Sequence, residues 1–238
     1  MNNKNTIYQF SIAELLAHGK YEGNASIEQL LNYGDFGLGT LNGLDGEVVI
    51  TDGEAFTAKA DGAIQKTSKT SMAPMLFITD FSPDIKFKID RKMSYQQIQN
   101  IINEKIPSEN IFYAIKIKGF FKSLNCRSIA KQAKPYPPIT EIRKNMTHLE
   151  YANINGTLIG FKSPAYIDKI GMPGYHFHFI DIDKTKGGHL FDFEAEQCII
   201  EIDPKHECHL KLEKSKELYN VELSESYPKI LNDLEKKL

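Results

Sequence analysis

Three histidines in the last third of the chain are the side chains best suited to chemistry. His176 and His178 lie two residues apart in the run GYHFHF at 174–179, and His189 follows soon after. Side chains two residues apart on a β-strand point to the same face of a sheet. The spacing therefore predicts a strand that carries two imidazoles on one face.

A hairpin after this strand would bring the third histidine to the other two. With the turn centred between Asp183 and Lys184, His189 lies directly opposite His178, where Cβ atoms of antiparallel neighbours are about 5 Å apart. Three imidazole nitrogens on one sheet face suit zinc in a catalytic site, because three protein ligands leave one position open for substrate. The alternative is an incidental group of packed or surface histidines, and the hairpin spacing favours the metal.

The remaining histidines and the cysteines give no second metal site. His206 and His209 are three residues apart, which places them on opposite faces of a strand, so we interpret them as structural. Cys126, Cys198 and Cys208 are odd in number and have no CxxC spacing. Neither a disulfide framework nor a thiolate zinc site is indicated, and reduced thiols in a cytoplasmic protein fit best.

The elements that must hold the histidines are mostly strands. Turn-forming residues and β-branched composition predict strands at 156–161, 175–183, 189–194 and 198–202. The final dozen residues are typical of a charged helix. The prolines of KQAKPYPP at 131–138 cannot donate to a sheet ladder. This segment therefore marks an extended linker or a division of the chain.

The first half adds short helices to a strand meander. A serine followed three residues later by Glu or Gln is typical of a helix start, and three such pairs predict helices at 11–18, 26–33 and 94–105. The Asp-Gly pairs at 45–46 and 52–53 predict hairpin turns around a strand at 47–51. Residues 110–121 alternate as a strand does, with one uniformly apolar face.

These elements together predict an α+β fold with two strand-rich halves, 1–134 and 135–238. Each half is expected to hold a mostly antiparallel or mixed sheet flanked by short helices. The metal site is expected on a sheet face of the second half, and the halves are expected to form one functional unit.

Composition narrows the class of partner. The chain has 238 residues, of which 41% are hydrophobic and 25% charged, as in an ordinary globular protein. A net charge of −2 without a basic stripe argues against nucleic acid. The apolar runs fall far short of the roughly 18 residues of a membrane span, and the N-terminus has no clear signal-peptide core. We expect a cytoplasmic protein that acts on a small molecule and binds no membrane.

Longer segments make the chain similar to the α-acetolactate decarboxylase family over nearly its whole length. These segments are GDFGLGTLNGLDGE at 34–47, NIFYAIKIKGFFKSLNCRS at 110–128, KQAKPYPPITE at 131–141, NGTLIGFKSP at 155–164 and PGYHFHFIDIDKTKGGHL at 173–190. The resemblance implies that a zinc enzyme converts 2-acetolactate to acetoin and CO2. In the resemblance, His176, His178 and His189 fall on the metal-ligand positions. It also implies a homodimer.

The resemblance assigns active-site roles to four further residues. Glu47, Arg127 and Thr40 match a glutamate, an arginine and a threonine of the family site. Without the resemblance they would be interpreted as the first residue of a strand, a surface charge and a strand-surface hydroxyl. Glu235 is matched mainly by its distance from the better-matched segments, and alone it is typical of a solvated helix charge. If that match holds, the C-terminal tail folds back over the metal.

The reaction explains why these residue types would be needed together. Loss of CO2 from a 3-keto acid leaves an electron pair that must spread onto the ketone oxygen as an enediolate. Zinc would stabilise that charge as a Lewis acid, and Arg127 would hold the departing carboxylate or the developing oxyanion. Glu47 or Glu235 would then protonate one face, with a raised pKa.

Two other functions are compatible with the histidine pattern. Small β-barrel metal enzymes of the cupin type also place His-x-His on a strand with a later histidine, so a metal dioxygenase or isomerase is one alternative. A non-catalytic ligand-binding module of the same fold is the other, because folds are reused across functions.

Overall fold

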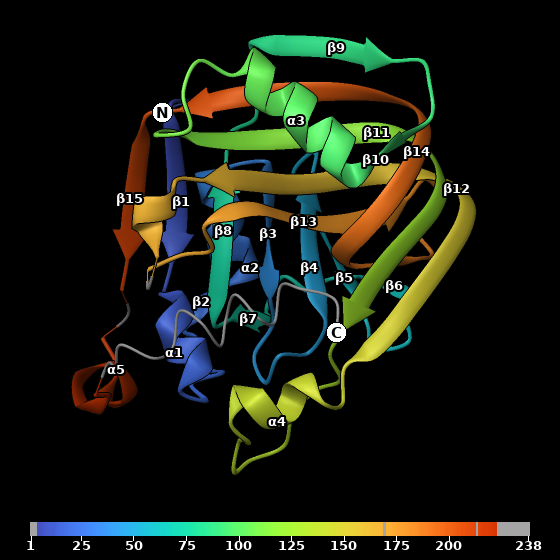
Figure 1. Cartoon of the computed structure of the whole chain (residues 1–238). Helices are drawn as coiled ribbons and strands as arrows, with labels where there is room; N and C mark the ends of the chain where they lie inside the picture. The colour runs from blue at the N-terminus through green and yellow to red at the C-terminus, as the bar shows by residue number, and fades with distance from the viewer. Residues whose placement is uncertain (1–3, 169, 213, 223–238) are drawn as a thin grey trace.

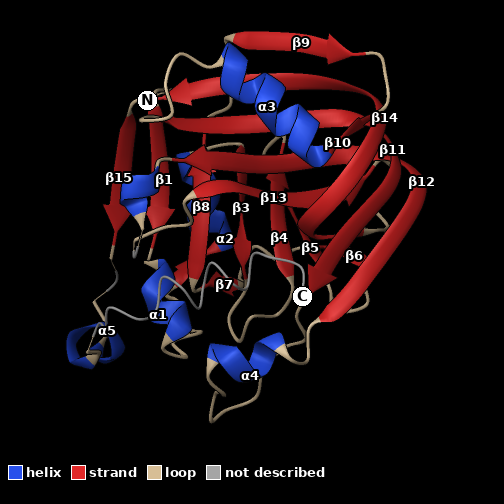
Figure 2. Ribbon diagram, viewed as in Figure 1, coloured by secondary structure: helices blue, strands red, loops and turns tan. Residues whose placement is uncertain are grey.

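Two large β-sheets packed face to face make up most of the molecule (Figures 1 and 2). The computed structural model describes residues 4–168, 170–212 and 214–222. Strands dominate and the helices are short, as the sequence predicts. No helix in these ranges has the length and apolar character that a membrane crossing needs.

The first sheet has seven strands in the order β15-β1-β8-β3-β4-β5-β6. Their bounds are β1 Thr6–Phe10, β3 Phe36–Thr40, β4 Glu47–Thr51, β5 Glu54–Ala58, β6 Ile64–Lys66, β8 Met75–Thr79 and β15 Glu207–Lys211. Neighbours are antiparallel except β1 and β15, which are parallel. Asp52 and Gly53 both have positive φ, as a two-residue turn between β4 and β5 requires. Two short strands, β2 Ala25–Ser26 and β7 Met72–Ala73, pair separately.

The second sheet contains three long, curved strands (Figure 1). Its strands are β9 Ile85–Ile89, β10 Met93–Ser94, β11 Phe112–Ser128, β12 Thr147–Ser163, β13 Gly174–Asp181 and β14 Gly187–Lys205. Strand β11 pairs with β12, β12 with β13, β13 with β14, and β14 again with β11. These four strands therefore close into a ring.

The helices lie at the edges and outer faces of the sheets. They are α1 Ala13–Ala17, α2 Ile27–Leu30 with the 3-10 turn η1 Leu31–Tyr33, α3 Tyr95–Lys105, α4 Ile139–Arg143, the 3-10 turn η2 Ala165–Ile167, and α5 Lys216–Asn220. The reciprocal serine and glutamine caps predicted for α2 and α3 are present. The predicted cap at Ser11 is wrong, because the Ser11 N–H continues the sheet by bonding to Lys211 and its φ is +68°.

Three further sequence expectations differ from the structure. The two strands expected at 189–194 and 198–202 are one strand, β14, because its pairing with β11 continues through the residues between them. The strand expected at 110–121 continues to Ser128. The division at residue 134 is not confirmed, because β9, β10 and β11 join the second sheet while β15 joins the first. The predicted C-terminal helix lies outside the described residues.

Apolar side chains fill both faces of each sheet. One core lies between the sheets and combines residues such as Leu38 and Phe77 with Ile159 and Phe161. A second core fills the inside of the strand ring against α3, and a third lies under α2. Phe177 and Phe179 belong to the core inside the ring, so the alternating histidines of β13 face the first sheet.

Candidate metal centre

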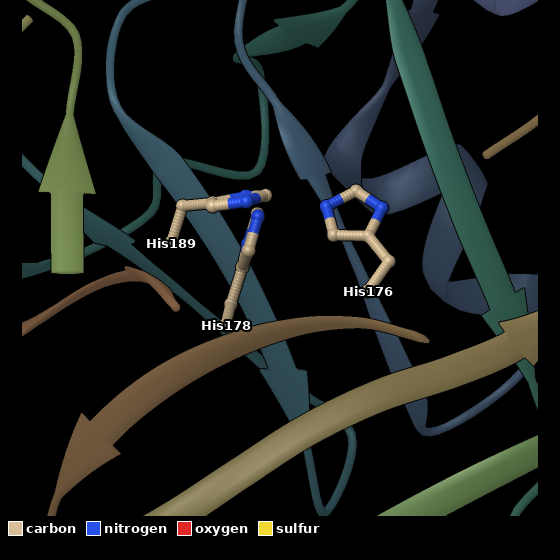
Figure 3. Close-up of side chains that lie close together, drawn as sticks. All are labelled: His176, His178 and His189. Atoms are coloured by element: carbon tan, nitrogen blue, oxygen red, sulfur yellow. The ribbon is translucent and has the colours of Figure 1, made fainter. Parts of the chain in front are cut away.

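The three histidines come together on the face of the second sheet that meets the first. The register of β13 and β14 pairs His178 with His189, as the hairpin spacing predicts. One ligand atom from each of His176, His178 and His189 lies within 4.8 Å of the others, and the ring centroids are 4.9 to 5.2 Å apart. Figure 3 shows the three rings on the same side of their strands.

The protonation state of His178 is fixed by its surroundings. Its ring is 1% exposed, and Nδ1 lies 2.7 Å from the carbonyl oxygen of Val48 on β4. A carbonyl can only accept, so Nδ1 carries the hydrogen and Nε2 presents its lone pair to the site. Burial lowers the pKa of His178 to about 4. A neutral imidazole oriented by a carbonyl is the form that binds a metal ion.

An ion pair from both sheets borders the histidines. Arg127 Nη1 on β11 donates to Glu47 Oε1 on β4 at 2.5 Å, and both residues are buried. Glu47 Oε2 lies 3.3 Å from His178 Nε2. Both of these atoms present lone pairs, so their close approach favours a positive charge beside them. The three-nitrogen donor set and this contact fit a bound metal cation.

Thr40 lies next to Glu47, and Glu235 lies outside the described residues. Thr40 on β3 pairs in register with Glu47, and its Oγ1 donates to the carbonyl oxygen of Gly46 at 2.8 Å. This bond closes the loop that leads into Glu47. The structure thus brings six of the seven predicted site residues to one place, while their individual catalytic roles stay predictions.

A small pocket connects these residues. Its cavity volume is about 70 Å³, several times the roughly 10–15 Å³ that one water molecule needs. Beside the polar residues, the wall is apolar and consists of Leu16, Leu38, Gly39, Leu44, Met75, Phe77, Ile129, Ile139 and Met172. Electrostatic interactions gain strength in such surroundings, because little water screens them. The pocket suits a small anionic ligand held at one end by charge.

Sequence reasoning missed the apolar wall and the backbone contact to His178. Leu16 comes from α1, Ile139 from α4 and Met172 from the segment before β13. Nothing in their spacing distinguishes them from other core residues, since only the packing of distant segments brings them together. The Val48 carbonyl carries no side-chain signal at all.

Comparison with known proteins agrees with the geometry. The alpha-acetolactate decarboxylase family model matches residues 7–225. Alpha-acetolactate decarboxylase of Bacillus subtilis strain 168 is 38% identical over 229 residues, covering 96% of this chain and 89% of the relative. The enzyme of Methanosarcina mazei is 33% identical over 235 residues, covering 99% and 82%.

Solved structures show the same fold. The crystal structure of alpha-acetolactate decarboxylase from Bacillus subtilis strain 168 superposes with a TM-score of 0.95 at 37% identity, covering 98% of this chain and all of the other. A Staphylococcus aureus protein of unknown function, described as similar to alpha-acetolactate decarboxylase, gives 0.90 at 28% identity, covering 97% and 100%. The chain belongs to the alpha-acetolactate decarboxylase family, whose members are carboxy-lyases.

Proposed function

We propose that this chain is a zinc-dependent decarboxylase that converts 2-acetolactate to acetoin and CO2. The observation that carries the proposal is the meeting of three histidine nitrogens with a buried arginine and glutamate in one small pocket. Family membership supports decarboxylation of acetolactate. Three neutral nitrogen donors with an open side are the ligand set that catalytic zinc takes.

The reaction breaks one carbon–carbon bond and adds one proton. As CO2 leaves, the electron pair of the broken bond moves into the substrate and is shared with the ketone oxygen. His176, His178 and His189 would hold zinc, whose Lewis acidity would lower the energy of this charge. Because the wall is largely apolar, the charged groups of the pocket interact more strongly than they would in bulk water.

Arg127 is the residue we assign to the substrate carboxylate. Its guanidinium is charged at every physiological pH, and its planar donors match the two oxygens of a carboxylate. Glu47 holds it in place from the opposite sheet. We therefore assign Arg127 the role of orienting the bond that breaks. Another group transfers the proton.

Glu47 is the residue we assign to that proton transfer. It is the single carboxyl group among the described residues that line the pocket. His178 cannot supply the proton from Nδ1, because that hydrogen is directed to the Val48 carbonyl. The Glu47 carboxylate, paired with Arg127, would take up a proton from solvent and pass it to the carbon that has lost CO2. Glu235 remains the other candidate donor.

Metal removal tests the proposal directly. The purified protein is expected to contain zinc and to form acetoin from acetolactate, and a chelator should abolish the activity until zinc returns. His176→Ala should lose zinc, because one of three ligands is gone. His206→Ala is the matched control. That histidine is exposed and lies between β14 and β15, at the opposite end of β14 from His189. Full acetoin formation by metal-free protein would overturn the zinc requirement.

The same assay separates the other expectations. A cupin-type dioxygenase would need oxygen, whereas decarboxylation should proceed at the same rate without it. A non-catalytic binding module would form no acetoin. We also propose a cytoplasmic homodimer, which light scattering of the purified protein and fractionation of the source cells would test.

A further inference from the structure

His189 occupies the position where strand β14 changes its neighbour. The pairing of β14 with β13 runs through residues 187–189 and ends with His178 opposite His189. The pairing with β11 begins at the same residue, with Arg127 opposite His189. The ring of four strands therefore closes at one of the three proposed metal ligands.

An irregularity follows directly after this position. Along β11 the partner of Cys126 is Leu190, but the partner of Asn125 is Asp192, so Phe191 has no partner on β11. One extra residue in this arrangement is a β-bulge, a feature common beside active sites because it redirects a side chain. Leu190 and Phe193, three residues apart, consequently share the core inside the strand ring. Phe191 joins the core between the sheets, as ordinary alternation from His189 requires.

The Phe191 ring lies on the same face of β14 as His189, which is two residues before it, and contacts two histidines. Its edge meets the His189 ring at a centroid distance of 6.0 Å and an angle of 70°. Its other contact is a stack on His148 of β12, at 5.8 Å and 25°. His148 is exposed and pairs in register with Arg127. Phe191 itself is 9% exposed and does not line the pocket.

We propose that Phe191 is a positioning residue for the metal ligand His189. Burial and the stack on His148 hold the Phe191 ring, and the ring limits rotation of the His189 imidazole, so that its nitrogen is held toward the other two ligands before zinc arrives. Preorganised ligands bind a metal more tightly, because less freedom is lost on binding. This inference rests on the proposed zinc site and adds a residue that touches neither the pocket nor the ion.

Leucine substitutions at two phenylalanines of β14 test the inference. Phe191→Leu keeps an apolar side chain but removes the ring, and Phe193→Leu makes the same change two residues along, in the core on the other face. Zinc affinity would be measured by competition with a chelator, and ligand geometry by the visible absorption of the cobalt-substituted protein. Phe191→Leu should weaken zinc binding about tenfold, the lower end of what loss of an outer partner of a ligand costs, and shift the cobalt bands.

The control separates positioning from general packing. Both variants should lose thermal stability, but Phe193→Leu should keep the zinc affinity and the cobalt spectrum of the wild type. If Phe191→Leu also keeps both, the positioning role is wrong even though the zinc site stands. If the wild-type protein binds no zinc, the proposed function is wrong and the inference fails with it.

A further variant covers the case in which Phe191→Leu does not fold. His148 is exposed, so His148→Ala should fold normally while removing the ring that supports Phe191 from outside. We expect a smaller loss of zinc affinity in the same direction. If this variant keeps both the zinc affinity and the cobalt spectrum of the wild type, the Phe191 ring stacked on His148 does not position His189, and the inference is wrong.

Discussion

Two buried ion pairs of the molecule differ in what surrounds them. Glu47 and Arg127 come from opposite sheets and meet beside the histidines. Asp203 and Lys205 lie together on β14, and their charged groups are 2.7 Å apart. All four residues are buried, so burial alone does not distinguish a catalytic pair from a structural one.

The second pair is saturated by the protein itself. Lys205 Nζ donates to the carbonyl oxygens of Lys4 and Asp80 as well as to Asp203, which uses the three hydrogens of an ammonium group. Asp203 also accepts the backbone N–H of Ser82 at 2.6 Å. Burial raises the pKa of Asp203, against the lowering effects of Lys205 and Ser82. This pair ties β14 to the strand ends of the first sheet and leaves no donor for a ligand.

The first pair, by contrast, opens onto a pocket with further chemistry. Glu47 and Arg127 line the same cavity as the three histidines. Buried charges thus indicate a functional site when a cavity and metal ligands accompany them. Changes to the first pair should therefore reduce the rate, and changes to the second should reduce stability without changing the rate.

The largest effect is expected from Glu47→Gln. Glutamine keeps an oxygen that can accept from Arg127, but its amide protons are not acidic enough to be transferred. The kcat for acetoin formation should fall about 10²- to 10⁴-fold, the range that a general acid contributes. Steady-state assays of the folded enzyme would measure the rate, and its zinc content should stay close to that of the wild type. The unfolding free energy should also fall, because Arg127 keeps an acceptor but loses its counter-ion.

Glu201→Gln is the matched control for this change. Glu201 lies on β14 and pairs with Lys86 at the surface, 2.7 Å apart, away from the pocket. The kcat of Glu201→Gln should equal that of the wild type. Full rate together with full enantiopurity of the acetoin from the Glu47 variant would remove Glu47 from the proton transfer and leave Glu235 as the candidate.

The next effect is on stability, and it belongs to the second pair. Lys205→Met leaves the Asp203 charge buried without its partner and removes the donor to two carbonyls. Breaking a buried pair in this way costs about 3–5 kcal/mol of unfolding free energy. Urea unfolding would measure the loss, and the kcat of the folded fraction should be unchanged.

A surface pair provides the reference for that loss. Lys86→Met removes the partner of Glu201 at an exposed site, where an ion pair is worth about 1 kcal/mol or less. If Lys205→Met lowers the unfolding free energy by no more than Lys86→Met does, the buried pair contributes no more than a surface pair. A fall in kcat would mean instead that the two ends of the interface are coupled.

The histidine site could be predicted from sequence because its determinants are local. Strand alternation aligns His176 with His178, and a short hairpin fixes the register that brings in His189. The caps of α2 and α3 were equally local. Ser11 shows where local patterns fail. Its N–H donates to the Lys211 carbonyl of the parallel strand β15, from the other end of the chain, and the cap does not form.

The rest of the site depends on which sheet faces reach each other, and periodicity cannot show this. Glu47 and Arg127 are 80 residues apart, and the Val48 carbonyl is 130 residues from His178. Only family resemblance singled out Glu47 and Arg127 beforehand. Periodicity likewise does not show which strands join which sheet, since strand order within a sheet does not follow chain order here.

The smallest effect is expected at Thr40, which supports the first pair through the backbone. Thr40→Val removes the hydrogen bond from Oγ1 to the Gly46 carbonyl while keeping the side-chain shape. The unfolding free energy should fall by about 0.5–1.5 kcal/mol. The kcat should fall much less than in Glu47→Gln, because the loop before Glu47 loosens while the carboxyl group remains.

Thr57→Val is the control that separates the loss of stability from the loss of rate. Thr57 is buried on the neighbouring strand β5 and shares a hydrogen bond of 2.7 Å with Thr67, outside the pocket. Its substitution should cost a similar amount of stability with no change in kcat. If Thr40→Val lowers kcat as far as Glu47→Gln does and costs no stability, Thr40 acts on the substrate itself. The catalytic set from the first sheet would then consist of two neighbouring side chains on β3 and β4 rather than one residue and its support.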